Sequence, residues 1–330
     1  MSVDVRRGLS VAALFAIAGC SGGQSGTPAA LSAGSGSGMS VVHRGIPFMP
    51  PARRNAVVRH TQSTYPTNKV LVFEADQEES AVNIYLAKDI ASNPAPIATI
   101  HVQAGCPYGL ATDKNGTLYV ADNCGGNDVE EYPKGSTTVG TIITDGISNP
   151  LGLAIDKNQT LYVSNYPASI TEYAYGTTTP SKTITGGGMS DPFGLALDKA
   201  GNLYIADFGA SAVFELPAGG SSVTNLNLQN LGEPLGLAIW KKQGLLWETG
   251  GGGNLINVYK LGSTSPMQTI TGNGDPYAIS LENQGRLHGR VVESDLGPHV
   301  VYGYKPMQYA PYATLNNGVE LPTGLLDKKP

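Results

Sequence analysis

An acidic or amide residue ends the second apolar segment in several copies of an internal repeat. Asp122, Asn165 and Asp207 each complete a segment that begins Leu-Tyr. The full set comprises Glu74, Asp122, Asn165, Asp207 and Glu248, with Glu293 aligned less securely. Oxygen side chains around one axis could bind Ca²⁺ or another hard cation. Asp and Asn at strand ends also cap their own turns by accepting hydrogen bonds from nearby backbone amides. The pattern therefore has two interpretations, a calcium site and a set of turn caps.

A second set of candidate residues follows the proline that begins each repeat. Its members are Tyr108, Leu151, Phe193, Leu235, Tyr277 and Thr323. Apolar side chains at the mouth of an axial channel would either fill the channel or form an aromatic-rimmed pocket. Such a pocket suits a peptide, a glycan or a small hydrophobic molecule.

The repeat itself predicts the fold. The phrase Pro-x-Gly or Pro-x-Ala, followed by an apolar pair, begins at Pro107, Pro150, Pro192, Pro234 and Pro276, at intervals of 42 or 43 residues. An imperfect copy begins at Pro322. A period in the low forties, built from short strands and Gly/Asn turns, is typical of β-propeller blades. Each full period is expected to supply four strands, although Arg286 to Ser294 is expected to be irregular or to carry an insertion.

The two ends of the repeat region complement each other. Val70 to Phe73, Val82 to Leu86 and Ile97 to Ile100 are predicted as second, third and fourth strands without a first strand. Pro322 to Leu326 is predicted as a first strand without partners. Joining them gives an all-β, six-bladed propeller over residues 69–330. Closure by strands from both ends of the domain removes an exposed sheet edge.

The repeat resembles the NHL repeat and its gluconolactonase-like relatives. The resemblance rests on Pro107 to Asp113 with Leu118 to Asp122, and on their copies. It implies a six-bladed propeller. The resemblance also implies a metal site, because gluconolactonase-like enzymes have metal-binding Asn and Asp residues at the position after the proline. Amidating lyases of the NHL type have His at that position. This chain has aromatic and aliphatic residues there instead. A binding or scaffolding module is therefore favoured, and a divergent metal-dependent lactonase, hydrolase or lyase is the alternative.

The N-terminus is expected to be a membrane anchor. Arg6 and Arg7 precede an apolar run from Leu9 to Ala18, which is shorter than the roughly 20 residues needed to span a bilayer. Ile17 to Cys20 resembles a bacterial lipobox, which implies a signal peptide over 1–19 and lipid on Cys20. Residues 20–68 are expected to form a linker, Gly/Ser-rich and then basic. This predicts a lipid-anchored protein of the cell envelope, on the outer-membrane or periplasmic side; an ordinary secretion signal is the alternative.

The other two cysteines are predicted to form a disulfide. Cys106 precedes the first strand of its blade and Cys124 follows the second, so an antiparallel hairpin returns both to one end. An extracytoplasmic compartment permits such a bond. Two free buried thiols are the alternative.

Charge constrains the partners. After Lys69 the chain has 14 basic and 25 acidic residues, a formal charge of −11, which argues against a nucleic-acid partner. The expected partners are the membrane, through the lipid, and a protein, peptide or glycan ligand; no cofactor is required unless Ca²⁺ binds. The chain is expected to be a monomer.

Overall fold

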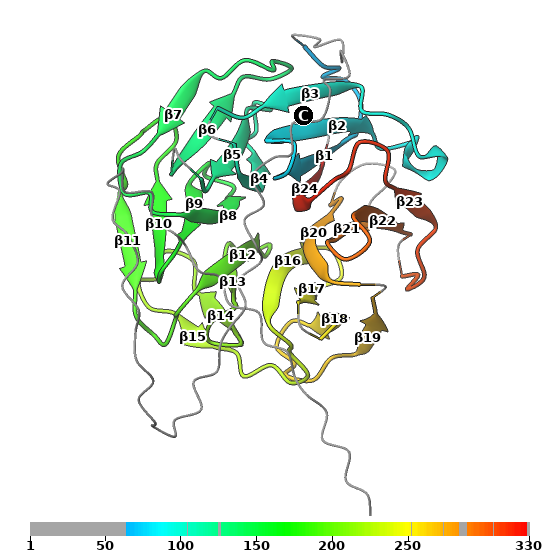
Figure 1. The fold of residues 1–330 in the computed structure, drawn as a ribbon. Helices are drawn as coiled ribbons and strands as arrows, with labels where there is room; N and C mark the ends of the chain where they lie inside the picture. The colour runs from blue at the N-terminus through cyan, green and yellow to red at the C-terminus, as the bar shows by residue number, and fades with distance from the viewer. Residues whose placement is uncertain are drawn as a thin grey trace, which may run out of the picture. The chain divides into compact units, whose positions relative to one another are not determined.

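The computed structural model describes residues 64–103, 105–124, 127–251, 253–272, 274–283, 289–305 and 307–328. Cys20 and the expected signal and linker up to residue 63 lie outside these residues. The described chain forms six four-stranded antiparallel sheets around one axis (Figure 1). This is the predicted six-bladed propeller.

Each blade runs from a first strand near the axis to a fourth strand at the rim. The first strands are β4 (Pro107–Thr112), β8 (Pro150–Ile155), β12 (Pro192–Leu197), β16 (Pro234–Trp240), β20 (Pro276–Leu281) and β24 (Pro322–Lys328). The second strands are β5 (Leu118–Asp122), β9 (Leu161–Asn165), β13 (Leu203–Asp207), β17 (Leu245–Gly250), β21 (Val291–Asp295) and β1 (Leu71–Asp76). Neighbouring first strands contact one another around the whole ring.

The outer strands follow the same order. The third strands are β6 (Asp128–Tyr132), β10 (Ser169–Tyr173), β14 (Ala212–Leu216), β18 (Leu255–Lys260), β22 (Val300–Tyr304) and β2 (Ala81–Leu86). The fourth strands are β7 (Thr141–Ile143), β11 (Lys182–Thr185), β15 (Thr224–Asn225), β19 (Gln268–Thr271), β23 (Ala313–Leu315) and β3 (Ala98–His101). A short 3-10 helix, η1 (Ile90–Ser92), connects β2 to β3. The region expected to be irregular contains a regular strand, β21, from Val291 onward.

Strands from both ends of the domain share one blade, as predicted. β24 pairs antiparallel with β1, with Phe73 opposite Leu326 and Glu74 opposite Leu325. The sheet order is β24-β1-β2-β3. The described chain starts slightly before the expected domain boundary: Tyr65 is buried and its ring packs edge-on to Phe73, with centroids 5.6 Å apart.

The glycine of Pro-x-Gly is required by the distance between blades. A Cβ built on Gly109 would lie 2.4 Å from the carbonyl oxygen of Leu151, and one on Gly194 would lie 2.3 Å from that of Leu235. These are backbone atoms of the next first strand, which no side-chain rotation can move away. The repeat phrase therefore records a close approach of backbones at the axis.

Side-chain hydroxyls of the second strands join neighbouring blades near this close approach of the first strands. The Ser164 hydroxyl donates to the Phe193 carbonyl at 2.6 Å, and the Thr249 hydroxyl donates to the Tyr277 carbonyl at 2.6 Å. The first-strand Thr323 hydroxyl does the same with the Pro107 carbonyl at 2.5 Å. Each bond crosses from one blade to the next and satisfies a buried polar group.

Candidate functional site

The residues after the prolines lie where the first strands begin, and all six are buried. Three of them are aromatic and come from alternate blades, on β4, β12 and β20. The Tyr108 and Phe193 rings are 6.2 Å apart at an interplanar angle of 73°, and the Phe193 and Tyr277 rings are 5.5 Å apart at 89°. These are edge-to-face contacts between aromatic rings. Phe193 thus packs against a tyrosine from each of two other blades, and the three rings fill this end of the channel.

Both tyrosines of this aromatic plug (Tyr108, Phe193, Tyr277) are held neutral. Burial raises the pKa of Tyr108 to about 12, and burial, then the charge of Tyr108, raises the pKa of Tyr277 well above its ordinary value. The Tyr277 hydroxyl interacts with the hydroxyl of Tyr108 inside the plug. The three residues of the plug therefore act mainly through the packing of their rings.

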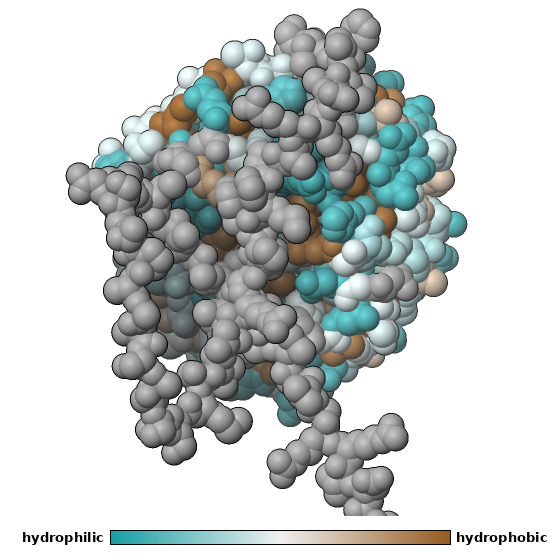
Figure 2. Space-filling model, in the orientation of Figure 1, coloured by the Kyte–Doolittle hydropathy of each residue, from teal (hydrophilic) through white to brown (hydrophobic). Residues whose placement is uncertain are grey.

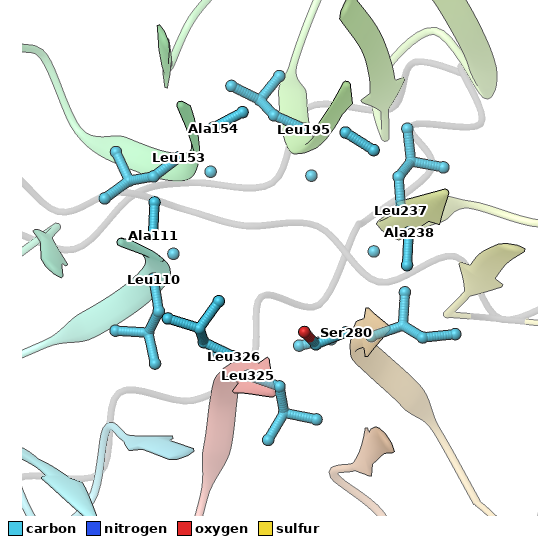
Figure 3. Close-up of a pocket in the computed structure, with 18 of the residues that line it drawn as sticks. Leu110, Ala111, Leu153, Ala154, Leu195, Leu237, Ala238, Ser280, Leu325 and Leu326 are labelled. Carbon is cyan, nitrogen blue, oxygen red and sulfur yellow. The ribbon is translucent and has the colours of Figure 1, made fainter. Parts of the chain in front are cut away.

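Beyond the plug the axial channel is a cavity of about 240 Å³. All six first strands line it, and in Figure 3 their labelled side chains surround one space. One layer consists of Leu110, Leu153, Leu195, Leu237, Ile279 and Leu325. The next consists of Ala111, Ala154, Ala196, Ala238, Ser280 and Leu326. An engineered apolar cavity of about 150 Å³ binds benzene, so this space can admit a somewhat larger apolar group.

Lys241 supplies the charge in the described lining, beside the amide of Asn283. Both residues come just after the ends of β16 and β20, on the face opposite the plug. Lys241 is exposed to solvent there, so the cavity reaches the surface on that side. Burial nevertheless lowers the pKa of the Lys241 amine, and the nearby Asp198 partly offsets this. The Asn283 side chain accepts a hydrogen bond from the Lys241 backbone amide at 2.9 Å, which holds this part of the rim.

A groove continues from the cavity mouth along the neighbouring blade. It is lined by Asp198, Lys199, Ala200 and Leu261, and it shares Ile239 and Lys241 with the cavity. On the visible part of the face in Figure 2, a hydrophobic patch lies among hydrophilic residues near the middle, and further hydrophobic residues lie at the rim. The cavity and groove together could hold an apolar group attached to a longer chain.

The carboxylates at the second-strand ends act as caps in their own blades. Asp207 accepts backbone amides from Ser190 and Asp191, each at 2.9 Å, and from Ala210 at 2.8 Å. Asp122 accepts those of Gly105 and Cys106 at 3.1 and 3.0 Å. Asn165 accepts that of Ser148 at 3.0 Å. These bonds join each second strand to the loop that enters the first strand, as the turn-cap interpretation expects. Whether a cation also binds at these residues stays a prediction.

Strand pairing corrects the alignment of the glutamates. Asp122 pairs with the proline Pro107, and the residues that pair with Pro322 and Pro276 are Asp76 and Asp295. Glu74, Glu248 and Glu293 lie earlier in their strands, opposite Leu325, Leu237 and Ile279. In the second strand of the first full blade this position holds Val120, opposite Leu110. The three glutamates therefore lie within their second strands and not at the strand ends.

Each of these three glutamates is buried and has an Oε1 atom without a hydrogen-bond partner. Asn83 donates to the Oε2 of Glu74 at 3.2 Å, and Asn257 donates to that of Glu248 at 3.0 Å. Burial is the main cause that raises the pKa of Glu248 to about 7 and that of Glu293 to about 8. These residues were predicted as possible cation ligands, which stays a prediction; the structure shows them as buried polar side chains within the blades.

Cys106 and Cys124 form the predicted disulfide, with Cα atoms 5.0 Å apart. The hairpin residues Asp113, Asp156 and Asp198 each accept hydrogen bonds from two backbone amides of their own turn. Asp113, for example, accepts those of Asn115 and Thr117 at 2.8 Å.

Within the described part of the chain, no helix is both long and apolar enough to cross a membrane.

Comparison with known proteins identifies the architecture. No protein-family model and no curated protein matches the sequence. A structure described as the nidogen/laminin complex is similar at a TM-score of 0.65 and 17% identity, covering 78% of this chain and 97% of that chain. A streptogramin B lyase is similar at 0.54 and 15%, covering 75% and 81%. A virginiamycin B lyase from Staphylococcus aureus is similar at 0.50 and 14%, covering 62% and 69%. The shared feature is the propeller fold.

Proposed function

We propose that this protein is a binding module of the cell envelope, anchored through lipid on Cys20, which holds an apolar group of a protein, peptide or envelope polymer in its axial cavity. The observation that carries the proposal is the composition of the cavity. Its side chains are mostly leucine, isoleucine and alanine, with Thr112, Ser280 and Asn283 among them, and the charge in the described lining comes from Lys241. Apolar side chains with a few polar groups among them are typical of ligand sites.

The position of the plug supports ligand entry on the opposite face. The rings of Tyr108, Phe193 and Tyr277 pack together at the other end, so a ligand would enter beside Lys241 and Asn283. The adjoining groove over Ala200 and Leu261 would accommodate the rest of a chain-like ligand. This moves the proposed entrance from the face favoured by the sequence to the other face.

The alternative is a metal-dependent lactonase or lyase of the gluconolactonase-like clan. The similar folds of two lyases are compatible with it but show architecture alone. The described cavity lining contains no histidine, aspartate or glutamate that could serve as a ligand or general base. The chemistry of the lining therefore favours a binding module over this enzyme.

Filling the cavity tests the proposal. Leu326 occupies the position that Ala111 and Ala154 have in their blades, so leucine is compatible with the fold there. The double variant Ala111→Leu/Ala154→Leu should weaken binding of the neutral fluorophore phenylnaphthylamine by at least about tenfold, with its melting temperature retained. Ala218→Leu, at an exposed hairpin, is the matched control and should bind as the wild type does. Equal binding by all three proteins would refute an axial site.

The anchor is tested separately. The Cys20→Ser variant should lose incorporation of radiolabelled palmitate and leave the membrane fraction. Retention of both labelling and membrane association would contradict lipidation at Cys20.

A further inference from the structure

Three carboxylates meet on the second and third strands of one blade. One carboxylate oxygen from each of Asp122, Asp128 and Glu130 lies within 4.8 Å of those from the other two. Asp122 and Glu130 are fully buried, and Asp128 is 7% exposed. Asp122 and Asp128 are directly opposite each other on β5 and β6. The blade thus concentrates three acidic groups in its interior.

The hydrogen bonds of the three groups leave one oxygen unsatisfied. Asp122 accepts the amides of Gly105 and Cys106. Glu130 accepts the amide of Gln103 through Oε1 at 3.0 Å and the Tyr132 hydroxyl through Oε2. The Oδ1 atom of Asp128 is buried without any partner. A buried carboxylate oxygen with no donor is costly unless a cation or a proton compensates for it.

The other blades show that the fold does not require this arrangement. Asp122 has counterparts such as Asp207, each of which caps the equivalent loop in its own blade. At the position of Asp128, the other blades have Ala81, Ser169, Ala212, Leu255 and Val300. At the position of Glu130, they have Asn83, Thr171, Phe214, Asn257 and Tyr302. The two additional acids are therefore particular to this blade, and packing alone gives no reason for them.

No basic side chain compensates Asp128 or Glu130: within the described ranges neither forms an ion pair with a lysine or arginine. Burial, followed by the charges of Asp122 and Glu130, raises the pKa of Asp128 to about 6. The cluster is also fixed in place, because Asp122 binds the amide of Cys106 and Cys106 is bonded to Cys124. A rigid group of oxygen donors with net negative charge suits a hard cation.

We propose that Asp122, Asp128 and Glu130 bind a calcium ion, with the unpartnered Oδ1 of Asp128 as a direct ligand. The ion would neutralise the buried carboxylates and stabilise the disulfide-linked end of this blade. The site is separate from the axial cavity, so the proposal does not depend on the binding function proposed above.

The test uses the full chain, treated with a chelator and then titrated with calcium chloride. Calorimetry should detect one calcium ion per chain. At 100 times the dissociation constant, calcium should raise the melting temperature by about 5–10 °C. Terbium should give tyrosine-sensitised luminescence, because Tyr132 donates to Glu130. The Asp128→Asn variant should lose all three responses. If Asp128→Asn fails to fold, Glu130→Gln provides a second test and should lose the same responses.

The matched control is Asp191→Asn. Asp191 is also a buried aspartate with an unpartnered Oδ1, beside Asp207, but among the residues that the structure describes it belongs to no three-carboxylate cluster. This variant should respond to calcium as the wild type does. The proposal is overturned by a wild type that neither binds calcium nor gains stability at millimolar concentration, or by an Asp128→Asn protein that keeps the full response.

Discussion

The side chains of Phe193 and Tyr277, on β12 and β20, meet edge to face with ring centroids 5.5 Å apart although another blade separates their strands. The contact joins two blades that are not neighbours in the propeller, and it does not depend on strand pairing. Together with Tyr108 it closes one end of the axial channel. The site is therefore a cavity that is blocked at one end, and several measurable consequences follow from this and from how the ring is closed.

Removing the central ring of the plug should destabilise the domain. Phe193→Ala deletes a buried ring and its contacts with both tyrosines, so the free energy of unfolding should fall by about 3–5 kcal/mol in urea denaturation. Tyr277→Phe is the control, since it keeps the ring and removes only the hydroxyl, and it should cost no more than about 1 kcal/mol. If Phe193→Ala were as stable as the wild type, the three rings would not form a packed plug.

Deleting β24 should prevent stable closure of the ring. A chain ending at Glu320 lacks the strand that pairs with β1 and leaves Phe73 and Val72 without their neighbours. We expect the cooperative thermal transition to disappear when unfolding is monitored by circular dichroism. Deletion of Lys329 and Pro330 alone, which follow β24, should leave the transition unchanged. A cooperative transition at the wild-type temperature in the longer deletion would contradict closure by β24.

Stability should decrease as the pH rises from about 4.5 to 8. Burial first, then Asp295, raises the pKa of Glu293 in the folded protein to about 8, from an ordinary value of 4.5. Its stabilising contribution is thus complete below pH 4.5 and is lost as the pH approaches 8. One such group changes the free energy of unfolding by at most about 1.4 kcal/mol per pH unit. Denaturant titrations across this range should show a weaker pH dependence for Glu293→Gln; an unchanged slope would show that Glu293 does not titrate there.

Lys241 should affect charged ligands more than neutral ones. Lys241→Met keeps much of the apolar stem but removes the cation at the cavity rim. Binding of the anionic fluorophore anilinonaphthalene sulfonate should weaken by roughly fivefold, which corresponds to about 1 kcal/mol. Binding of neutral phenylnaphthylamine should be retained. A parallel loss for both fluorophores would indicate damage to the cavity instead of a charge effect.

The disulfide should contribute substantially to stability. Cys106 and Cys124 are 18 residues apart, and closing a loop of this length stabilises by about 3 kcal/mol in the chain-entropy model. Cys106→Ser/Cys124→Ser should therefore unfold at lower denaturant concentration than the wild type. Reduction of the wild type should reproduce the decrease, and it should leave the double variant unchanged. A bond that is absent from the folded protein would give no difference between oxidised and reduced samples.

The sequence alone determined the number of blades, the position of almost every strand, the closing strand and the disulfide. These features follow from local patterns that repeat with a constant period, so comparing copies reveals them. Glycine after Pro-x is one example: a Cβ at that position would collide with the backbone of the next blade in five copies, and Ala278 occupies it in the sixth.

The tertiary structure decided the features that depend on register and on contacts between distant blades. Glu74 and Asp76 point to the same side of β1 because side chains alternate along a strand, so the sequence pattern could not distinguish a shift of two residues. Only pairing with Pro322 identifies Asp76 as the cap. The packing of Phe193 on Tyr277, and the meeting of Asp128 with Asp122 and Glu130, likewise require side chains in space. A repeat fixes which residues are equivalent, whereas their distances across the axis and within a blade exist only in the folded ring.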